Sequence, residues 1–241
     1  MPSIAIIRSQ VESRIPGALS VYQRSEPEVF PTGIPALDTQ IGGIPKSALT
    51  QICAASATSS GKTTLLTSLF AQVTQAEQFC AVVDAGDSFS PASAAAMNVC
   101  LSRLLWVRCS GSSRLKPVEQ AFKAADILVQ NGGFGIIAID LGNVDEGQIR
   151  KIPLTTWFRF ARVVEKSSTA LVVLMAYPAA LSCAALTLNI RQCLPHWSGT
   201  ANISHAQILS DIQFDFEIGR SRTRKPVQNA NARFTARPRW A

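Results

Sequence analysis

The chain has 241 residues, of which 47% are hydrophobic and 16% are charged. This length supports one sizeable core, with or without a small appendage, and the composition excludes an intrinsically disordered chain. Six scattered cysteines without a C-x-x-C pair favour a reducing, cytoplasmic protein with buried thiols, and we expect no zinc site.

The net charge of +7 is concentrated at the C-terminal end of the sequence. Seven basic residues and no acidic residue follow Gly219, namely Arg220, Arg222, Arg224, Lys225, Arg233, Arg237 and Arg239. The remaining basic residues balance the 16 acidic ones, so the body of the chain is neutral. We therefore expect a basic C-terminal tail, 219–241, which either contacts a polyanion such as nucleic acid or is simply solvated.

The N-terminal part of the sequence predicts an arm, 1–30, that contains a short helix at 11–15. Residues 31–47 are rich in glycine and proline, which predicts turns around a short helix at 36–40. From residue 48 onward the pattern changes to apolar runs that alternate with amphipathic segments. This alternating part and the turns before it form the main core, which we expect at 31–218.

The core pattern predicts an α/β fold. Apolar strands are expected at 48–54, 79–84, 104–108, 135–140 and 170–175. Helices are expected at 62–74, 91–97, 117–130 and 153–166. Such an alternation predicts a mostly parallel sheet with helices on both faces. Alternating apolar residues at 211–218 and 232–235 predict antiparallel edge strands near the C-terminus.

The segment 170–188 carries no charge and is long enough to cross a bilayer. However, it begins with the β-favouring run Val172–Leu174 and is interrupted at Tyr177-Pro178. A buried strand followed by an apolar loop or a short helix explains this pattern better than a membrane span.

A phosphate-binding loop is the strongest local signal. The run 56–64 follows an expected strand and opens an expected helix, which is the context of a P-loop that binds ATP and Mg²⁺. Lys62 can reach the β- and γ-phosphates, and Thr63 can place a hydroxyl on Mg²⁺. The expected ATP-binding residues are Ser56, Ser59, Ser60, Gly61, Lys62, Thr63 and Thr64. Ser56 stands where the P-loop pattern has glycine, so a plain helix N-terminus with an exposed lysine is the alternative interpretation.

Asp140 is expected to help hold Mg²⁺ through water. It ends the apolar run Gly135–Asp140, which has the pattern of a Walker B strand. Many buried strands end in an aspartate, and the prediction therefore depends on Asp140 occurring together with Lys62.

Several segments resemble the RecA recombinase family over residues 31–226. They are Thr32–Asp38, Gly42–Pro45, Ser59–Thr64, Val83–Ala85 and Arg103–Val107. Among its members the chain is similar to the shorter ImuA-type relatives, which accompany error-prone polymerases in damage-induced (SOS) mutagenesis. The stretch Arg150–Arg159 points to these relatives.

The sequence departs from this family at positions that serve hydrolysis and strand pairing. The family's Asp-Ala-Glu segment supplies a glutamate that activates the attacking water, and the matching run here, 84–86, reads Asp-Ala-Gly. Glycine cannot act as a base, and Asp87 is the remaining candidate. The family's γ-phosphate-sensing Asn-Gln pair is Ala-Tyr here, at 176–177, and its polar DNA-binding loop is apolar, at 178–188.

The resemblance therefore implies an ATP-binding accessory protein of DNA repair and translesion mutagenesis, with weak or absent ATP hydrolysis. Its implied partners are a RecA-type filament or a translesion polymerase, with single-stranded DNA as a further ligand. Two alternatives remain open. One is a DNA-dependent ATPase that acts as a recombinase with Asp87 as its base, and the other is a non-catalytic scaffold without nucleotide binding, as Ser56 would indicate.

The resemblance also implies a role for Arg220 and Arg222. In the family, two lysines before a proline reach across the filament interface to the neighbour's ATP, and these arginines lie at the same distances before Pro226. They would then stabilise the γ-phosphate of a neighbouring copy in a homo-oligomer. The alternative is that they belong, with Arg224 and Lys225, to the basic tail.

Overall fold

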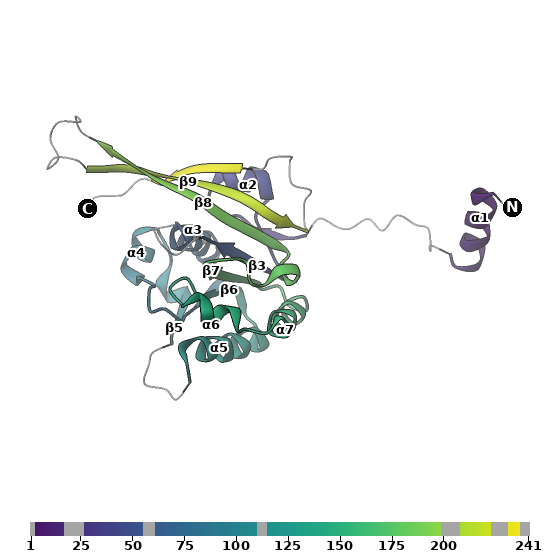
Figure 1. The fold of residues 1–241 in the computed structure, drawn as a ribbon, viewed down its shortest axis with the longest axis horizontal. Helices are drawn as coiled ribbons and strands as arrows, with labels where there is room; N and C mark the ends of the chain where they lie inside the picture. The colour runs from purple at the N-terminus through teal and green to yellow at the C-terminus, as the bar shows by residue number, and fades with distance from the viewer. Residues whose placement is uncertain are drawn as a thin grey trace.

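The computed structural model describes residues 3–16, 27–54, 61–109, 115–198, 208–222 and 231–236. Its centre is an eight-stranded sheet in the order β10-β9-β8-β3-β7-β6-β4-β5 (Figure 1). The strands of this sheet are β3 (Ala48–Cys53), β4 (Phe79–Asp84), β5 (Leu104–Arg108), β6 (Phe134–Asp140), β7 (Ala170–Met175), β8 (Leu186–Ser198), β9 (Ile208–Ser221) and β10 (Asn231–Ala236). A separate pair, β1 (Val29–Phe30) and β2 (Ile44–Pro45), is antiparallel.

Neighbouring strands are parallel within the series β8-β3-β7-β6-β4-β5, whereas β9 is antiparallel to β8 and β10 is antiparallel to β9. The predicted fold class, a mostly parallel α/β sheet with helices on both faces and antiparallel strands near the C-terminus, is confirmed. The predicted strands and core helices agree with the observed ones to within three residues at either end.

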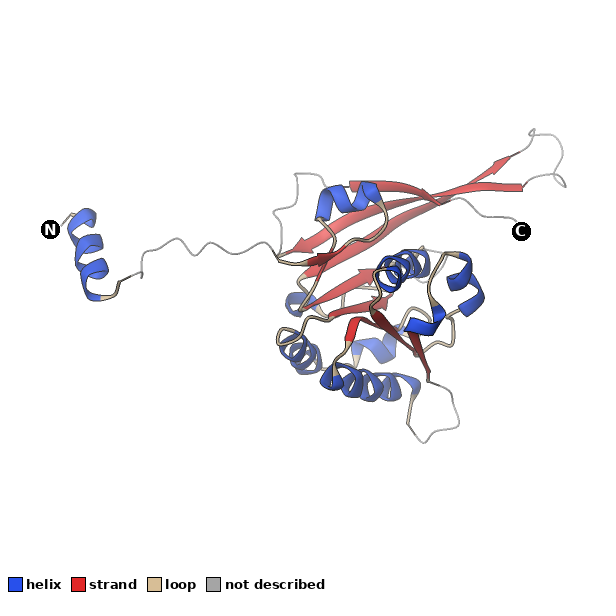
Figure 2. Cartoon of the chain, turned by 180° about the vertical axis from the view of Figure 1, so that it is seen from behind, coloured by secondary structure: helices blue, strands red, loops and turns tan. Residues whose placement is uncertain are grey.

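Helices cover both faces of the sheet (Figure 2). One face packs against α2 (Pro35–Ile41), α3 (Lys62–Gln75) and α4 (Pro91–Ala96). The other face packs against α5 (Pro117–Asn131), α6 (Glu146–Arg150) and α7 (Leu154–Val164). Single 3-10 turns, Leu101–Arg103 and Leu181–Cys183, precede β5 and β8.

The central strands are buried on both faces because each side chain meets one helical layer or the other. In β4, Cys80 and Val82 contribute to the core under α3, while Ala81 and Val83 contribute to the core under α5 and α7. All four are fully buried. This two-sided burial explains why the strands read as continuous apolar runs rather than as an alternating pattern.

Trp157, Phe160 and Val164 form the buried face of α7. Trp157 and Phe160 are each 1% exposed, so their packing role is the expected one for aromatic residues at this helical spacing. No helix in the described part of the chain is long and apolar enough to cross a membrane.

The N-terminal helix differs from the prediction. It is α1 (Ile4–Arg14), which begins earlier than the expected helix at 11–15, and none of its residues is buried. In Figure 1 it lies apart from the rest of the protein. The boundaries 1–30, 31–218 and 219–241 stay a prediction, with β1 beginning at Val29 and β9 continuing to Ser221.

Helix α6 and strand β8 were not predicted from the sequence, and neither were the two-residue strands β1 and β2 or the 3-10 turns. Helix α6 has only five residues, and β8 contains Pro195, which usually argues against a strand. Pro195 is tolerated here in the long ladder with β9, where it lies opposite Ile212. The ladder carries the β8–β9 pair beyond the parallel part of the sheet (Figure 2).

Candidate functional site

The first helix after β3 begins at the position expected for a phosphate-binding loop. β3 ends at Cys53, and α3 starts at Lys62 with Gly61 as its N-cap residue. Gly61 has φ +75° and ψ 2°, the left-handed conformation that glycine adopts without strain. Ser56, Ser59 and Ser60 lie outside the described residues. The free N–H groups of the α3 N-terminus create a partial positive charge that suits an anion.

Gly61 is also required by packing. A Cβ atom added to Gly61 would lie 2.4 Å from Cε1 of Phe214, a residue of β9. Phe214 is 2% exposed, so its ring is fixed in the core. Glycine is therefore required for two reasons, the left-handed backbone conformation and the closeness of the Phe214 ring, which lies 153 residues away in sequence.

Lys62 and Asp140 meet around Gly142, in the loop after β6. A Cβ atom added to Gly142 would lie 3.4 Å from Nζ of Lys62 and 3.0 Å from Oδ1 of Asp140. Lys62 Nζ donates to the carbonyl oxygen of Ala54 at 3.2 Å. Burial lowers the pKa of Lys62 from its usual value, and the negative charge of Asp140 opposes this shift.

Asp140 ends β6 and is 4% exposed. Its Oδ1 accepts a hydrogen bond from Gly142 N at 2.8 Å, and its Oδ2 accepts one from Ser88 Oγ at 3.2 Å. Burial raises the pKa of Asp140, while the Gly142 hydrogen bond and the Lys62 charge act in the opposite direction. The Asp140 carboxyl group is thus buried and accepts hydrogen bonds from Gly142 N and Ser88 Oγ. A cation beside it would offset the cost of burying its charged form.

Asp84 lies opposite Asp140 in the sheet and orients the next loop. Its carboxylate accepts hydrogen bonds from the backbone N–H groups of Ser88 and Phe89, at 3.1 and 2.8 Å, and from Trp106 Nε1 at 3.4 Å. These contacts position Ser88 beside Asp140. Sequence reasoning did not single out Ser88, because nothing local marks a serine whose partner lies 52 residues away.

Thr63 and Thr64 occupy the first turn of α3, directly after Lys62. Thr63 is exposed and Thr64 is half-buried. The backbone carbonyl of Thr63 accepts a hydrogen bond from Thr67 Oγ1 at 2.7 Å. The structure therefore places Gly61, Lys62, Thr63 and Asp140 at the carboxyl end of the parallel strands.

Asp87, the candidate base, is engaged in a different contact. Its two carboxylate oxygens accept hydrogen bonds from Arg108 Nε and Nη2 at 2.8 and 2.7 Å. This exposed pair lowers the pKa of Asp87 and makes it a weaker base. Asp87 also has φ 50°, which is unusual for a residue other than glycine.

The position expected to carry the family's glutamate is closed. A Cβ atom added to Gly86 would lie 2.9 Å from Cβ of Asn143, in the loop after β6. Any larger side chain at 86 therefore requires that loop to move. Neither Gly86 nor the paired Asp87 presents a free base beside Lys62 and Asp140.

Arg220 and Arg222 lie at the other end of the sheet. Arg222 N donates to Ala185 O, and Ala185 N donates to Leu49 O near the beginning of β3, both at 2.8 Å. The side chain of Arg222 also donates to Ser182 O. Arg220 is exposed, and Arg224 and Lys225 lie outside the described residues. These arginines thus lie at the opposite end of the sheet from Lys62 of the same chain, and their contact with a neighbouring copy stays a prediction.

The carboxyl edge of this parallel α/β sheet brings together a helix N-terminus, the half-buried Lys62 and the buried Asp140. Open α/β proteins generally bind their ligands at this edge. The family model described as the RecA N-terminal domain matches residues 16–144, more than half of the chain. The chain therefore belongs to the RecA family. The matched region includes both Lys62 and Asp140.

Three curated relatives illustrate this similarity, and each is named Protein RecA. The protein from Methylococcus capsulatus is 36% identical over 115 residues, which cover 47% of this chain and 31% of the relative. The protein from Azospirillum lipoferum is 37% identical over 117 residues, 48% of this chain and 30% of the relative. The protein from Desulfotalea psychrophila is 30% identical over 160 residues, 60% of this chain and 43% of the relative. The chain thus matches less than half the length of each relative.

Proposed function

We propose that this chain is an ImuA-type, ATP-binding accessory protein of DNA repair and translesion mutagenesis that hydrolyses ATP weakly or not at all. Membership of the RecA family supports the repair context and the nucleotide. The subfamily rests on the resemblance of the stretch Arg150–Arg159. The observation that carries the proposal is an edge of the sheet where Lys62 and Asp140 lie together and where, among the described residues, the positions expected for a base are Gly86 and the Arg108-paired Asp87.

The residues of this edge fit ATP and Mg²⁺. Gly61, the N-cap residue of α3, has no side chain, and the adjacent Lys62 would contact the β- and γ-phosphates. Thr63 and Asp140 would hold Mg²⁺, which neutralises phosphate charge when it is bound. The pKa of Lys62 is lowered and that of Asp140 is raised, each mainly by burial, and both shifts support this assignment. A half-buried cation and a buried carboxylate both gain from a ligand of opposite charge.

We expect weak ATP hydrolysis because of the residues that stand where a base would activate the attacking water. Gly86 has no side chain and faces Asn143, and the Asp87 carboxylate is paired with Arg108. General-base catalysis typically contributes about 10²–10⁴-fold to a rate, so loss of the base leaves binding with little hydrolysis.

The test is ATP hydrolysis by the full chain with Mg²⁺, with and without single-stranded DNA, beside Asp87→Ala. We expect a rate close to the protein-free background that neither DNA nor the substitution changes. A DNA-stimulated rate that Asp87→Ala abolishes would instead establish the recombinase-type ATPase. Partner binding by a RecA-type filament or a translesion polymerase then needs a separate pull-down with purified proteins in the ATP-bound state.

A further inference from the structure

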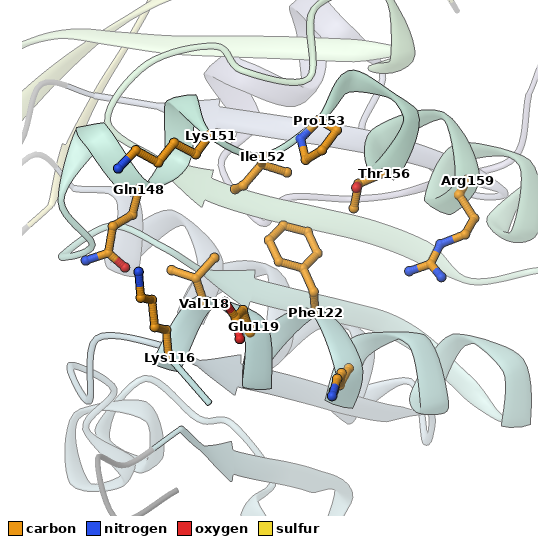
Figure 3. Close-up of a pocket in the computed structure, with 11 residues that line it drawn as sticks. Lys116, Val118, Glu119, Phe122, Gln148, Lys151, Ile152, Pro153, Thr156 and Arg159 are labelled. Carbon is orange, nitrogen blue, oxygen red and sulfur yellow. The ribbon is translucent and has the colours of Figure 1, made fainter. Parts of the chain in front are cut away.

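A cavity of about 450 Å³ opens between α5 and α7, on the helical face that packs under β6 and β7 (Figure 3). We call it the α5–α7 pocket. It is lined by Lys116, Val118, Glu119, Phe122, Lys123, Gln148, Lys151, Ile152, Pro153, Thr156 and Arg159. None of these residues takes part in the proposed nucleotide site, and its volume is within the range of ligand pockets.

The floor of the α5–α7 pocket is apolar and rigid. Figure 3 shows the Phe122 ring between the two helices, facing Ile152 and Pro153. The ring packs edge-on against Trp157, with centroids 5.3 Å apart, and against Phe160, with centroids 5.7 Å apart. Trp157 and Phe160 are core residues, so the floor is preformed and its shape does not depend on a ligand.

The rim of the α5–α7 pocket is basic. Lys116, Lys123 and Lys151 are exposed, and within the described part of the chain none of them forms an ion pair. Arg159 lies 3.6 Å from Asp126, and Glu119 is the acidic residue of the lining. The rim therefore carries an excess of positive charge that is free to meet an anionic partner.

We propose that the α5–α7 pocket binds an acidic peptide segment of a partner protein. One apolar side chain of the segment enters between Phe122 and Ile152, and its flanking carboxylates lie against Lys116, Lys123 and Lys151. A cavity with an apolar floor suits a single anchor side chain, which is how interface hot spots are built. A phosphate backbone would use the lysines but leave the floor empty, so the chemistry favours a peptide over a nucleic acid.

The proposal predicts selective binding of fluorescein-labelled decapeptides to the full chain, measured by anisotropy. The probes carry Asp and Glu around one central residue, which is Leu, Ile, Met, Phe, Tyr or Trp. We expect at least one of them to bind, and to bind about tenfold or more tightly than a Ser-centred or a Lys-flanked peptide. Raising the salt concentration should weaken the complex, because the rim lysines are exposed.

Two variants locate the site. Lys116→Glu/Lys151→Glu reverses the rim charge, and Thr156→Trp fills the cavity without changing a charge. Each should weaken peptide binding about tenfold or more, while Lys166→Glu, beyond the other end of α7, should leave it unchanged. Circular dichroism of every variant shows whether it is folded, and the charge-reversal variant touches only exposed side chains.

The proposal is overturned if no apolar-centred peptide binds, or if the peptides bind both pocket variants as tightly as the original chain. It is also overturned if single-stranded oligonucleotides bind through Lys116 and Lys151 while the peptides do not. These outcomes do not test the proposed nucleotide site, because Lys62 does not line the α5–α7 pocket. Lys62→Ala should therefore leave peptide binding unchanged.

Discussion

At the scale of single residues, the burial of Asp140 opposes the charge that it needs in order to hold Mg²⁺. A Mg²⁺ ligand must be charged, yet the side chain is 4% exposed and its pKa is raised by burial. The protein without nucleotide therefore includes a carboxylate that is costly to bury at neutral pH. Binding sites often carry such a local cost to stability, and it can be measured directly.

Asp140→Asn should raise the melting temperature of the nucleotide-free protein at neutral pH while weakening Mg²⁺-dependent ATP binding. A stabilisation of about 1 kcal/mol corresponds to about 2–4 °C for a chain of this size. The folded-state pKa of Asp140 lies above its usual value of 3.8, so the native state binds more protons, and the cost grows as the pH rises above 3.8. The difference between the two proteins, measured by calorimetry, should therefore shrink as the pH is lowered from 7 toward 4. A lower melting temperature for the variant at pH 7 would contradict this account.

Gly86 provides a second prediction at this scale. Gly86→Glu should not restore ATP hydrolysis and should destabilise the fold by about 1–3 kcal/mol, because its Cβ atom would meet Asn143 Cβ at 2.9 Å. Chemical denaturation checks the stability. The double variant Gly86→Glu/Asn143→Gly removes the contact and should regain most of the lost free energy of unfolding. Equal stabilities of the single and double variants would show that Asn143 does not close this position.

The residues of the site differ in how well sequence could predict them. Lys62 and Asp140 were predicted because each belongs to a local pattern, a loop before a helix and an aspartate after an apolar run. Three further residues were not predicted, namely Ser88, Asn143 and Phe214. Each contacts a residue that is at least 52 positions away in sequence and that only the fold brings close. The site residues that local patterns could not predict are therefore those whose contacts are distant in sequence.

At the scale of elements, the contact between the beginning of α3 and β9 joins the two parts of the sheet. β9 is an antiparallel addition, yet its Phe214 packs against the glycine that opens α3. The parallel strands were predicted well because two-sided burial makes them apolar throughout. β8 was missed because residues 194–198 are exposed and include Pro195. This outer part pairs with β9, whereas the pairing of β8 with β3 is confined to residues 186–189.

Gly61→Ala tests this contact. The substitution places a side chain in a left-handed conformation, which costs about 1–2 kcal/mol, and sets its Cβ atom 2.4 Å from the Phe214 ring. We expect a larger total loss, of about 2–4 kcal/mol, in urea denaturation. A double-mutant cycle with Phe214→Leu should show how much of this loss in unfolding free energy comes from the contact with the Phe214 ring. Additive effects of the two substitutions would mean that the ring and the glycine do not interact.

At the scale of the whole molecule, the fold has a core in two layers and an N-terminal helix that contributes nothing to it. Every residue of α1 lies outside the core, and Ile4, Ile6 and Ile7 are between 48% and 79% exposed. Removal of residues 1–16 should therefore change the melting temperature of the remaining chain by less than about 1 °C. A larger fall in a calorimetric comparison would show that α1 packs on the body in solution.

The central claim, a nucleotide site built from Lys62 and Asp140, is tested most directly by equilibrium binding of a fluorescent ATP analogue with Mg²⁺. The full chain is compared with Lys62→Ala and with the matched control Lys166→Ala, whose lysine lies after α7. We expect the original chain and the control to bind alike, and Lys62→Ala to bind at least about tenfold more weakly. No binding by the original chain, or equal binding by Lys62→Ala, would contradict the account and leave a scaffold that acts through its surfaces.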